Sequence, residues 1–165
     1  MQTNQEIVHI RPAQLRDIDA LVAFNAAMAQ ETEDKTLDPE VLRAGVAAVL
    51  AEPARGFYLV AECEGAVAGC LMITHEWSDW RNGDWWWIQS VYVDPAYRRR
   101  GVYRALHAET ARRARATPEV IGLRLYVEQD NAHAQRTYAA LGMTRSSYEI
   151  YALQFGAGAA ASDEQ

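Results

Sequence analysis

The segment between Asp94 and Arg104 carries the residues best suited to chemistry. It reads DPAYRRRGVYR and leads from an apolar strand through a proline turn into the start of a predicted helix. Free backbone N–H groups and the positive end of a helix dipole favour an anion at such a turn, and neighbouring guanidinium groups add charge-assisted hydrogen bonds. The segment lacks the G-x-x-x-x-G-K-[ST] pattern of a P-loop. The residues alone therefore predict a site for a compact anion and leave its identity open.

The distribution of charge supports this anion site. The formal net charge is −6, yet the stretch from Arg98 to Arg115 holds seven arginines and only one acid, Glu109. The acidic balance of the whole chain argues against a general nucleic-acid binder. Arg112 and Arg113 fit a solvated helix face equally well, as does the arginine that ends the stretch.

Hydrophobic periodicity and turn residues predict an α/β (α+β) protein built around one mixed sheet. The expected order is β-α-α-β-β-β-α-β-α-β, and residues 1–155 are expected to form a single domain. Residues 156–165 have nothing to bury and are expected to be disordered. Strands are expected at 6–12, 56–63, 66–77, 84–93, 121–128 and 146–155, and helices at 13–30, 39–52, 101–116 and 131–141.

The tryptophans gather in one predicted hairpin. All five lie between residues 77 and 87, around an Asn82-Gly83 pair that is typical of a two-residue turn. That turn places Trp80 opposite Trp85 on one face. Cross-strand packing explains such a hairpin; an aromatic wall beside a substrate channel and a contact between two copies of the chain are the alternatives.

The same register places Glu76 opposite Gln89, on the face that carries Trp80 and Trp85. Aromatic rings beside a carboxylate suit a cationic amine, through cation–π and ionic attraction. Further carboxylates lie in the charged segment 31–37. The candidate substrate-binding residues are therefore Glu31, Trp80, Trp85 and Gln89.

The two cysteines flank a predicted short turn. In that register Cys63 faces Ala66 and Cys70 faces Leu59, so the thiols are not cross-strand partners. We expect both to be free and buried as small apolar residues, with a catalytic or redox role as the alternative.

The segment after the apolar strand resembles the cofactor motif of the GNAT superfamily of N-acetyltransferases, [QR]-x-x-G-x-[GA] following a strand of the form V-x-V-x-P. Arg98 fills the first position of the motif and Gly101 the fourth. Tyr103 stands where the family usually has glycine or alanine, and Arg99 stands where an additional glycine is common. Any residue except proline supplies a backbone N–H, so the predicted cradle survives these departures.

A second segment, NAHAQRTYAALGM, resembles the family pattern N-x-x-A-x-x-x-Y-x-x-x-G-[FM]. The matching residues are Asn131, Ala134, Tyr138, Gly142 and Met143. Alanine and tyrosine at this spacing are one helical turn apart and share a side of the helix. With the element order, the resemblance covers nearly all of residues 6–155.

The resemblance implies a GNAT-like mixed sheet of six to seven strands flanked by about four helices. It implies acetyl-CoA as acyl donor, with its pyrophosphate on the backbone of residues 99–104 and its pantetheine arm beside Val91 and Val93. A backbone N–H near Val91 would stabilise the oxyanion, and Tyr138 would hydrogen-bond or protonate the leaving sulfur. Asn131 would steady the cofactor arm. The implied cofactor-binding residues are Val91, Tyr92, Val93, Arg98, Arg99, Arg100, Gly101, Val102, Tyr103, Arg104, Asn131 and Tyr138.

The substrate ammonium must also lose a proton. Many family members use a glutamate on the central strand, and the matching residue here is Gln89, which cannot act as a base. Glu76, its expected cross-strand neighbour, is the preferred catalytic candidate. An ordered water chain, Glu128, and the acidic residues Glu31 and Glu33 are the alternatives. A β-bulge in the central strand would change this ranking.

The activity implied by the resemblance is transfer of an acetyl group from acetyl-CoA to a primary amine, by direct attack in a ternary complex. The acceptor is expected to be a small amine or a peptide or protein amine. A non-catalytic acyl-CoA-binding regulatory domain and an acyltransferase acting on another group are alternatives. The sequence shows no signal peptide, membrane span or metal motif, so we expect a cytoplasmic protein that binds neither membranes nor nucleic acid. Family members often dimerise, and a homodimer is therefore an open alternative.

Overall fold

The structure is a computed structural model that describes residues 8–155. The chain divides into two compact units, one ending at Arg124 and one starting at Leu125. The expectation of disorder for residues 156–165 concerns a segment outside the described range. Within that range, no helix combines the length and the apolar character needed to cross a membrane.

The secondary structure follows the expected order as far as the last helix. In chain order the elements are β1 (His9–Pro12), a 3-10 turn (Leu15–Asp17), α1 (Ile18–Glu33), α2 (Pro39–Ala51), β2 (Phe57–Cys63), β3 (Ala66–Ser78), β4 (Gly83–Val93), a 3-10 turn (Pro95–Tyr97), α3 (Val102–Ala116), β5 (Val120–Leu125) and α4 (Ala132–Ala140).

The strands form one mixed sheet in the order β1-β2-β3-β4-β5. The first four strands are antiparallel neighbours. β5 runs beside β4 in the same direction, because Gly83 approaches Ile121 and, further along both strands, Trp85 approaches Gly122. A parallel pair needs a crossover connection, which α3 supplies.

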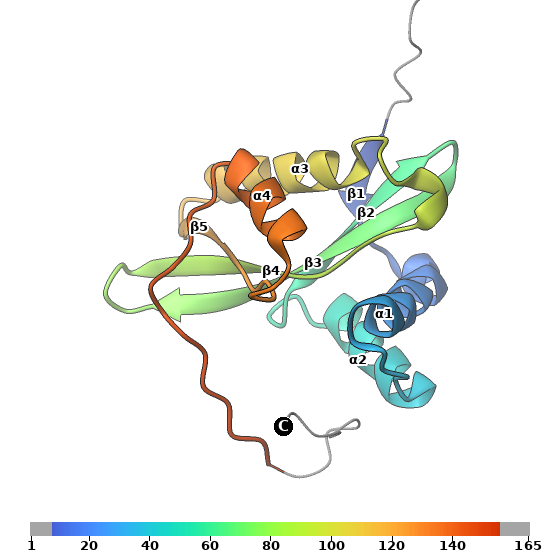
Figure 1. The fold of residues 1–165 in the computed structure, drawn as a ribbon, viewed down its shortest axis with the longest axis horizontal. Coiled ribbons are helices and arrows are strands. Elements are labelled where there is room, and N and C mark those ends of the chain that lie inside the picture. Colours follow the sequence, from blue (N-terminus) through green and yellow to red (C-terminus); the bar gives the residue numbers. More distant parts are fainter. Residues whose placement is uncertain (1–7, 156–165) are drawn as a thin grey trace, which may run out of the picture. The chain divides into compact units, whose positions relative to one another are not determined.

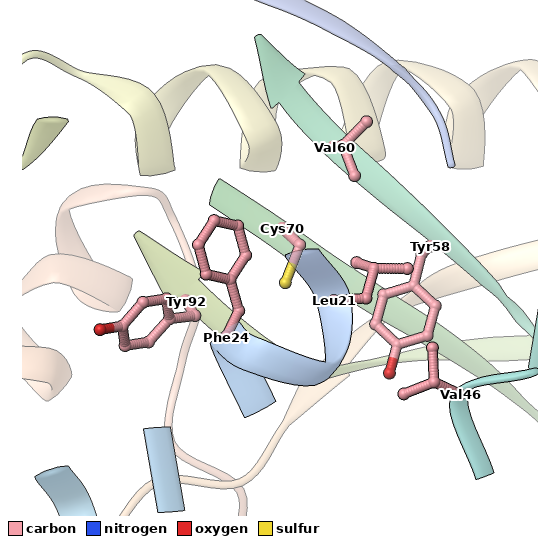
Figure 2. Close-up of a cluster of buried hydrophobic side chains, with 7 residues drawn as sticks. All are labelled: Leu21, Phe24, Val46, Tyr58, Val60, Cys70 and Tyr92. Carbon is pink, nitrogen blue, oxygen red and sulfur yellow. The ribbon is translucent and has the colours of Figure 1, made fainter. Parts of the chain in front are cut away.

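Helices α1 and α2 cover one face of the sheet and α3 covers the other (Figure 1). Figure 2 shows the core on the side of α1 and α2, where Leu21, Phe24 and Val46 meet Tyr58 and other strand residues. On the opposite side α3 buries one face of its own, which includes Val102, Leu106, Thr110 and Ala114. Burial on both faces makes the central strands a rigid platform for the residues at their ends.

Helix α2 begins where the sequence predicts. Asp38 is its N-cap: its Oδ1 accepts hydrogen bonds from the amides of Glu40 (2.9 Å) and Val41 (3.1 Å). Pro39 takes the first helical position, where no amide hydrogen is needed.

The prediction of six to seven strands is wrong for the described residues, which form five. β5 ends at Leu125 rather than 128, and residues 146–155 form no strand. Tyr148, Ile150 and Tyr151 in that segment are exposed. Apolar side chains that alternate onto both faces are typical of a strand covered on both sides, but a strand also needs a neighbour to pair with. The segment has strand-like residues and no ladder partner within residues 8–155.

A group of three charged side chains fastens β1 to β2 and to the turn before α1. Arg11 donates two hydrogen bonds to Asp17 (2.8 and 2.9 Å) and two to Glu62 (2.7 and 2.9 Å). Asp17, only 4% exposed, also accepts a hydrogen bond from the Gln14 amide (2.7 Å). The hydrogen bonds from Arg11 lower the pKa of both carboxyl groups.

Replacing Asp17 by asparagine should destabilise the fold by about 2 kcal/mol at neutral pH, because the half-buried guanidinium of Arg11 loses one of its two carboxylate partners. The lowered pKa of Asp17 in the folded state means that its stabilisation is fully present above the ordinary carboxyl pKa. It is lost as the pH falls through the folded-state value. Denaturant unfolding of D17N and the parent between about pH 7 and about pH 3 should therefore give converging stabilities. A constant difference, or no difference at neutral pH, would contradict this assignment.

Both cysteines are buried and neither forms a disulfide, as expected. Cys63 faces Ala66 as predicted, while Cys70 faces Val60 rather than Leu59, because β2 shifts register between Ala61 and Glu62. Burial raises the pKa of Cys70 to about 12.

Neither thiol should react with a thiol reagent in the folded protein at mildly alkaline pH. The reactive species is the thiolate, which burial disfavours, and both sulfurs are shielded from solvent. Labelling followed by mass spectrometry should show two modifications in guanidinium chloride and none in buffer. Native labelling as fast as that of free cysteine would show that one thiol is accessible.

Candidate functional site

The central strand β4 is interrupted by a β-bulge. Met72 faces Gln89 and Cys70 faces Tyr92, so two residues of β4 lie opposite Leu71 alone. One of them, Ser90, has a φ of 48°. A bulge interrupts the ladder and bends the strand, and pairing with β3 then resumes at Tyr92 and Val93, just before the predicted anion site.

The turn after β4 ends in an uncapped helix start. Two of its residues are left-handed, Arg99 (φ 67°) and Gly101 (φ 81°). The first α3 amide that bonds back is that of Ala105, to the Gly101 carbonyl (3.0 Å). The preceding amides, such as those of Val102 and Arg104, therefore lie at the positive end of the helix, where backbone donors lack helical acceptors. This geometry supports the predicted anion site.

The space at the helix start is open. A Cβ built on Gly101 meets nothing within 4 Å. Tyr103, at the position where the family favours a small residue, is half-buried and its ring lies 6.2 Å from that of His107, one turn further along α3. The tyrosine ring therefore leaves Gly101 uncovered. Burial lowers the pKa of His107.

The arginines of the motif differ in their side-chain contacts. Arg98 is held by protein groups and donates to Glu31 (2.7 Å) and to the Val93 carbonyl (3.0 Å). Arg99 and Arg104 are exposed and make no ion pair within the described part of the chain. These two guanidinium groups, rather than that of Arg98, remain available to a bound anion.

Two other predicted site residues meet at Arg98. Glu31 also accepts a hydrogen bond from the Tyr92 hydroxyl (2.7 Å), and the hydrogen bonds from Tyr92 and Arg98 lower the pKa of Glu31. The Tyr92 ring packs against Phe24 in the core, with centroids 5.2 Å apart. The side chain of Tyr92 is thus occupied by contacts with Glu31 and Phe24, and only the main chain of Tyr92 is left for a cofactor.

The predicted register of the hairpin is wrong. Pairing starts at Ser78 and Gly83 and leaves a four-residue loop, so Trp80 lies in the loop and is 87% exposed. Gly83 serves another purpose than the turn, because a Cβ there would lie 2.7 Å from the Glu119 carbonyl oxygen, just before β5. Of the predicted turn pair Asn82-Gly83, only Asn82 has a positive φ (49°).

The displacement from the predicted pairing is even, so each strand residue keeps its predicted face. Glu76, predicted opposite Gln89, instead lies opposite Trp85, and Gln89 lies opposite Met72. Met72 and Glu76 are four positions apart on β3, which is about 13 Å along a strand. Gln89 donates instead to the hydroxyl of Thr74 (2.6 Å).

The tryptophan face of the hairpin, which the sequence suggests as an aromatic wall for a substrate cation, already binds the guanidinium of Arg124. The guanidinium of Arg124 lies 4.0 Å from the centre of the Trp85 ring and 5.9 Å from that of Trp87. It also donates to Glu76 (2.9 Å), whose other oxygen accepts from the Trp87 indole. Gly122 makes room, because a methyl group there would collide with the Trp85 ring. Sequence reasoning missed Arg124, which no motif distinguishes from any other strand arginine.

The opposite face of the hairpin packs its aromatic rings against each other. Trp86 makes edge contacts with Phe57 and His75, at centroid distances of 5.1 and 6.1 Å. A cavity of about 440 Å³ lies beside this group, at the C-terminal end of α3. Because α3 has fifteen residues, this cavity is about 20 Å along the helix from Gly101 and separate from the anion site. Its lining residues are Pro12, Phe57, Trp86, Arg112, Arg113, Ala116 and Thr117.

The second motif forms helix α4 with both ends capped. The Asn131 side chain accepts from the Ala134 amide (3.0 Å). At the other end Gly142 (φ 85°) turns the chain, and the Met143 amide bonds to the Tyr138 carbonyl (3.0 Å) in a Schellman motif. The spacing from Tyr138 to Gly142 in the motif therefore matches the C-terminal cap of a helix. Tyr138 is half-buried, and burial raises its pKa.

The remaining base candidates are surface groups. Glu33 pairs with Lys35 (2.7 Å), and Glu128 is exposed in the second unit. Within residues 8–155 no group of three or more His, Cys, Asp or Glu could hold a metal ion.

Comparisons with known proteins agree with this geometry. The sequence model of the acetyltransferase (GNAT) family matches residues 19–143. The crystal structure of a possible acetyltransferase from Clostridium difficile 630 is 41% identical, with a TM-score of 0.86 over 92% of this chain and 100% of its own. No curated protein sequence matches the chain significantly.

More distant structures share the fold. An aminoglycoside N-acetyltransferase, AAC(6')-Iy, in complex with CoA is 14% identical, with a TM-score of 0.74 over 93% of this chain and 99% of its own. A ribosomal-protein-alanine N-acetyltransferase from Brucella melitensis biovar Abortus 2308 is 19% identical, with a TM-score of 0.73 over 91% and 100%. With a family match over most of its length, a bulged central strand and an open helix start after it, this chain belongs to the GNAT family of acetyltransferases.

Proposed function

We propose that the protein transfers an acetyl group from acetyl-CoA to a primary amine, by direct attack in a ternary complex. The observation that carries the proposal is the helix start of α3, where two left-handed residues and outward-facing amides follow a bulged strand. The proposed acceptor is a small amine or a peptide or protein amine. We propose one acetyltransferase domain over residues 1–155, since the family match includes parts of both compact units.

The residues present fit a diphosphate. Helix-start amides such as those of Val102 and Arg104 would donate hydrogen bonds, and the helix dipole would favour the negative charge. Arg99 and Arg104 would add guanidinium groups, while the uncovered Gly101 would permit a close approach of the backbone. The departures from the family motif at Arg99 and Tyr103 thus leave the cradle usable.

The bulged part of β4 would hold the rest of the donor. Val91 lies within the bulge and Val93 ends the strand; main-chain groups there are proposed to hold the pantetheine arm, and an amide near Val91 would stabilise the developing oxyanion. Acetyl-CoA supplies an activated thioester. Tyr138 is proposed to donate a proton to the leaving sulfur: its raised pKa keeps the phenol protonated at neutral pH. Asn131 is proposed to fix the start of the helix that carries this tyrosine.

The proton of the substrate ammonium is proposed to leave through ordered water. Glu76 accepts from Trp87 and Arg124, and its strand position is about 13 Å from that of Gln89. These contacts support a structural role for Glu76, which is proposed to hold the hairpin against β5. Gln89 in the position of a family base favours a second candidate function, a regulatory domain that binds acyl-CoA without turnover.

The first prediction from this proposal concerns turnover. The protein should bind CoA, and it should release thiol from acetyl-CoA when a suitable amine is present in a panel, with a KM for acetyl-CoA between about 1 μM and about 1 mM. Y138F should lower kcat by about 10²- to 10⁴-fold, since it lacks the proton donor, with unchanged CoA affinity. Y148F, in an exposed tyrosine, is the matched control. CoA binding without thiol release for any amine would favour the regulatory domain, and the absence of CoA binding would contradict both functions.

The second prediction concerns Glu76. With water as the proton acceptor, E76Q should lose less than about tenfold in kcat and keep the pH profile of the parent, whereas removal of a general base costs about 10²- to 10⁴-fold. Its unfolding free energy should fall, because Arg124 loses an ionic partner. E64Q, in the exposed turn between β2 and β3, serves as the control for loss of a carboxylate. A hundredfold loss with a shifted pH profile would make Glu76 the base.

A further inference from the structure

The first arginine of the cofactor motif is bound on three sides by the protein. Its Nη2 donates to Glu31 Oε2 (2.7 Å) and its Nε donates to the carbonyl of Val93 (3.0 Å). Its guanidinium carbon lies 5.5 Å from the centre of the Tyr92 ring. The Tyr92 hydroxyl donates to the other oxygen of Glu31 (2.7 Å), which closes the group.

This group joins three elements that the chain order keeps apart. Glu31 lies in the last turn of α1, Tyr92 and Val93 end the bulged strand β4, and Arg98 opens the loop that leads to α3. The loop residues that follow include the left-handed Arg99 and Gly101. A fixed Arg98 therefore sets the start of the loop relative to both β4 and α1.

The charges of the group separate two roles for Arg98. A guanidinium that binds phosphate directly would gain from having no carboxylate beside it, because Glu31 competes for its donors and repels an anion. A guanidinium that positions the loop needs Glu31 as its anchor. The 2.7 Å contact with a carboxylate whose pKa is lowered, together with the backbone contact to Val93, fits the positioning role.

We propose that Glu31, Tyr92 and Arg98 form a strut that holds the cofactor loop against α1, and that Arg98 is a positioning residue rather than a phosphate ligand. This rests on the proposed use of the loop for acetyl-CoA. It reassigns Glu31 from substrate binding to the support of the cofactor loop, and it links the end of α1 to the affinity for the acyl donor.

Calorimetric titration of CoA into E31Q, R98Q and the double variant tests the strut. Both single variants should weaken CoA binding by about fivefold, the effect of losing one exposed ion pair. The double variant should be no weaker than either single one, since both remove the same contact. Unchanged or tighter binding by E31Q together with weaker binding by R98Q would identify Arg98 as a direct phosphate ligand and overturn the proposal.

A matched control comes from the same helix. Asp19 at the start of α1 pairs with Arg43 of α2 (2.7 Å), so D19N removes a similar exposed ion pair. It should leave CoA affinity unchanged. If D19N weakens CoA as much as E31Q does, general loosening of α1 explains the effect and the strut is rejected.

Amide hydrogen exchange in the ligand-free protein tests the strut without any cofactor. E31Q and R98Q should speed exchange of the hydrogen-bonded amides within residues 94–98, whereas D19N should not. Equal protection of this loop in all three variants would overturn the proposal even if CoA binds. A parent protein that does not bind CoA, with faster loop exchange in E31Q, would contradict the proposed function and leave the strut standing.

Discussion

The break in the β4 ladder at Ser90 and Val91 is the constraint on which the rest of the site depends. Without the bulge, every residue of β4 beside β3 would take part in regular pairing. With two residues opposite Leu71, the strand bends before pairing resumes at Tyr92 and Val93, and it then leads into the turn that starts α3. The buried faces on both sides of the sheet hold this break in place. The bulge and the positive start of α3 thus lie on either side of the last paired residues of β4.

Several charged side chains of the structure form ion pairs within the chain. Arg98 is bound by Glu31, and Arg124 is bound by Glu76 and stacked on Trp85. The block of arginines that suggests an anion site therefore contains one residue fixed by the protein and others that face solvent, such as Arg99. This division lets the loop keep a fixed shape while it presents positive charge. The tryptophans of the hairpin pack against two other arginines, Arg81 and Arg124, which lie outside this block.

Much of this architecture follows from local sequence signals. The Asp38-Pro39 pair defines the start of α2, and the two motifs lie on a helix start and a capped helix as predicted. The faces of the hairpin are also correct, because an even register error preserves alternation. The predicted register of the hairpin is wrong because Gly83 is required where β5 approaches β4 and is not a turn residue. This is a long-range contact that a local turn pattern cannot predict. The bulge at Ser90 and the contacts of Arg124 likewise arise from neighbours distant in the sequence.

The most direct test of the account is a crystal structure of the protein with CoA bound. The account predicts diphosphate oxygens about 3 Å from helix-start amides, including those of Val102 and Arg104, with Arg98 still bound to Glu31. A diphosphate bound elsewhere, with the start of α3 empty, would contradict the central claim that this helix start is the cofactor cradle.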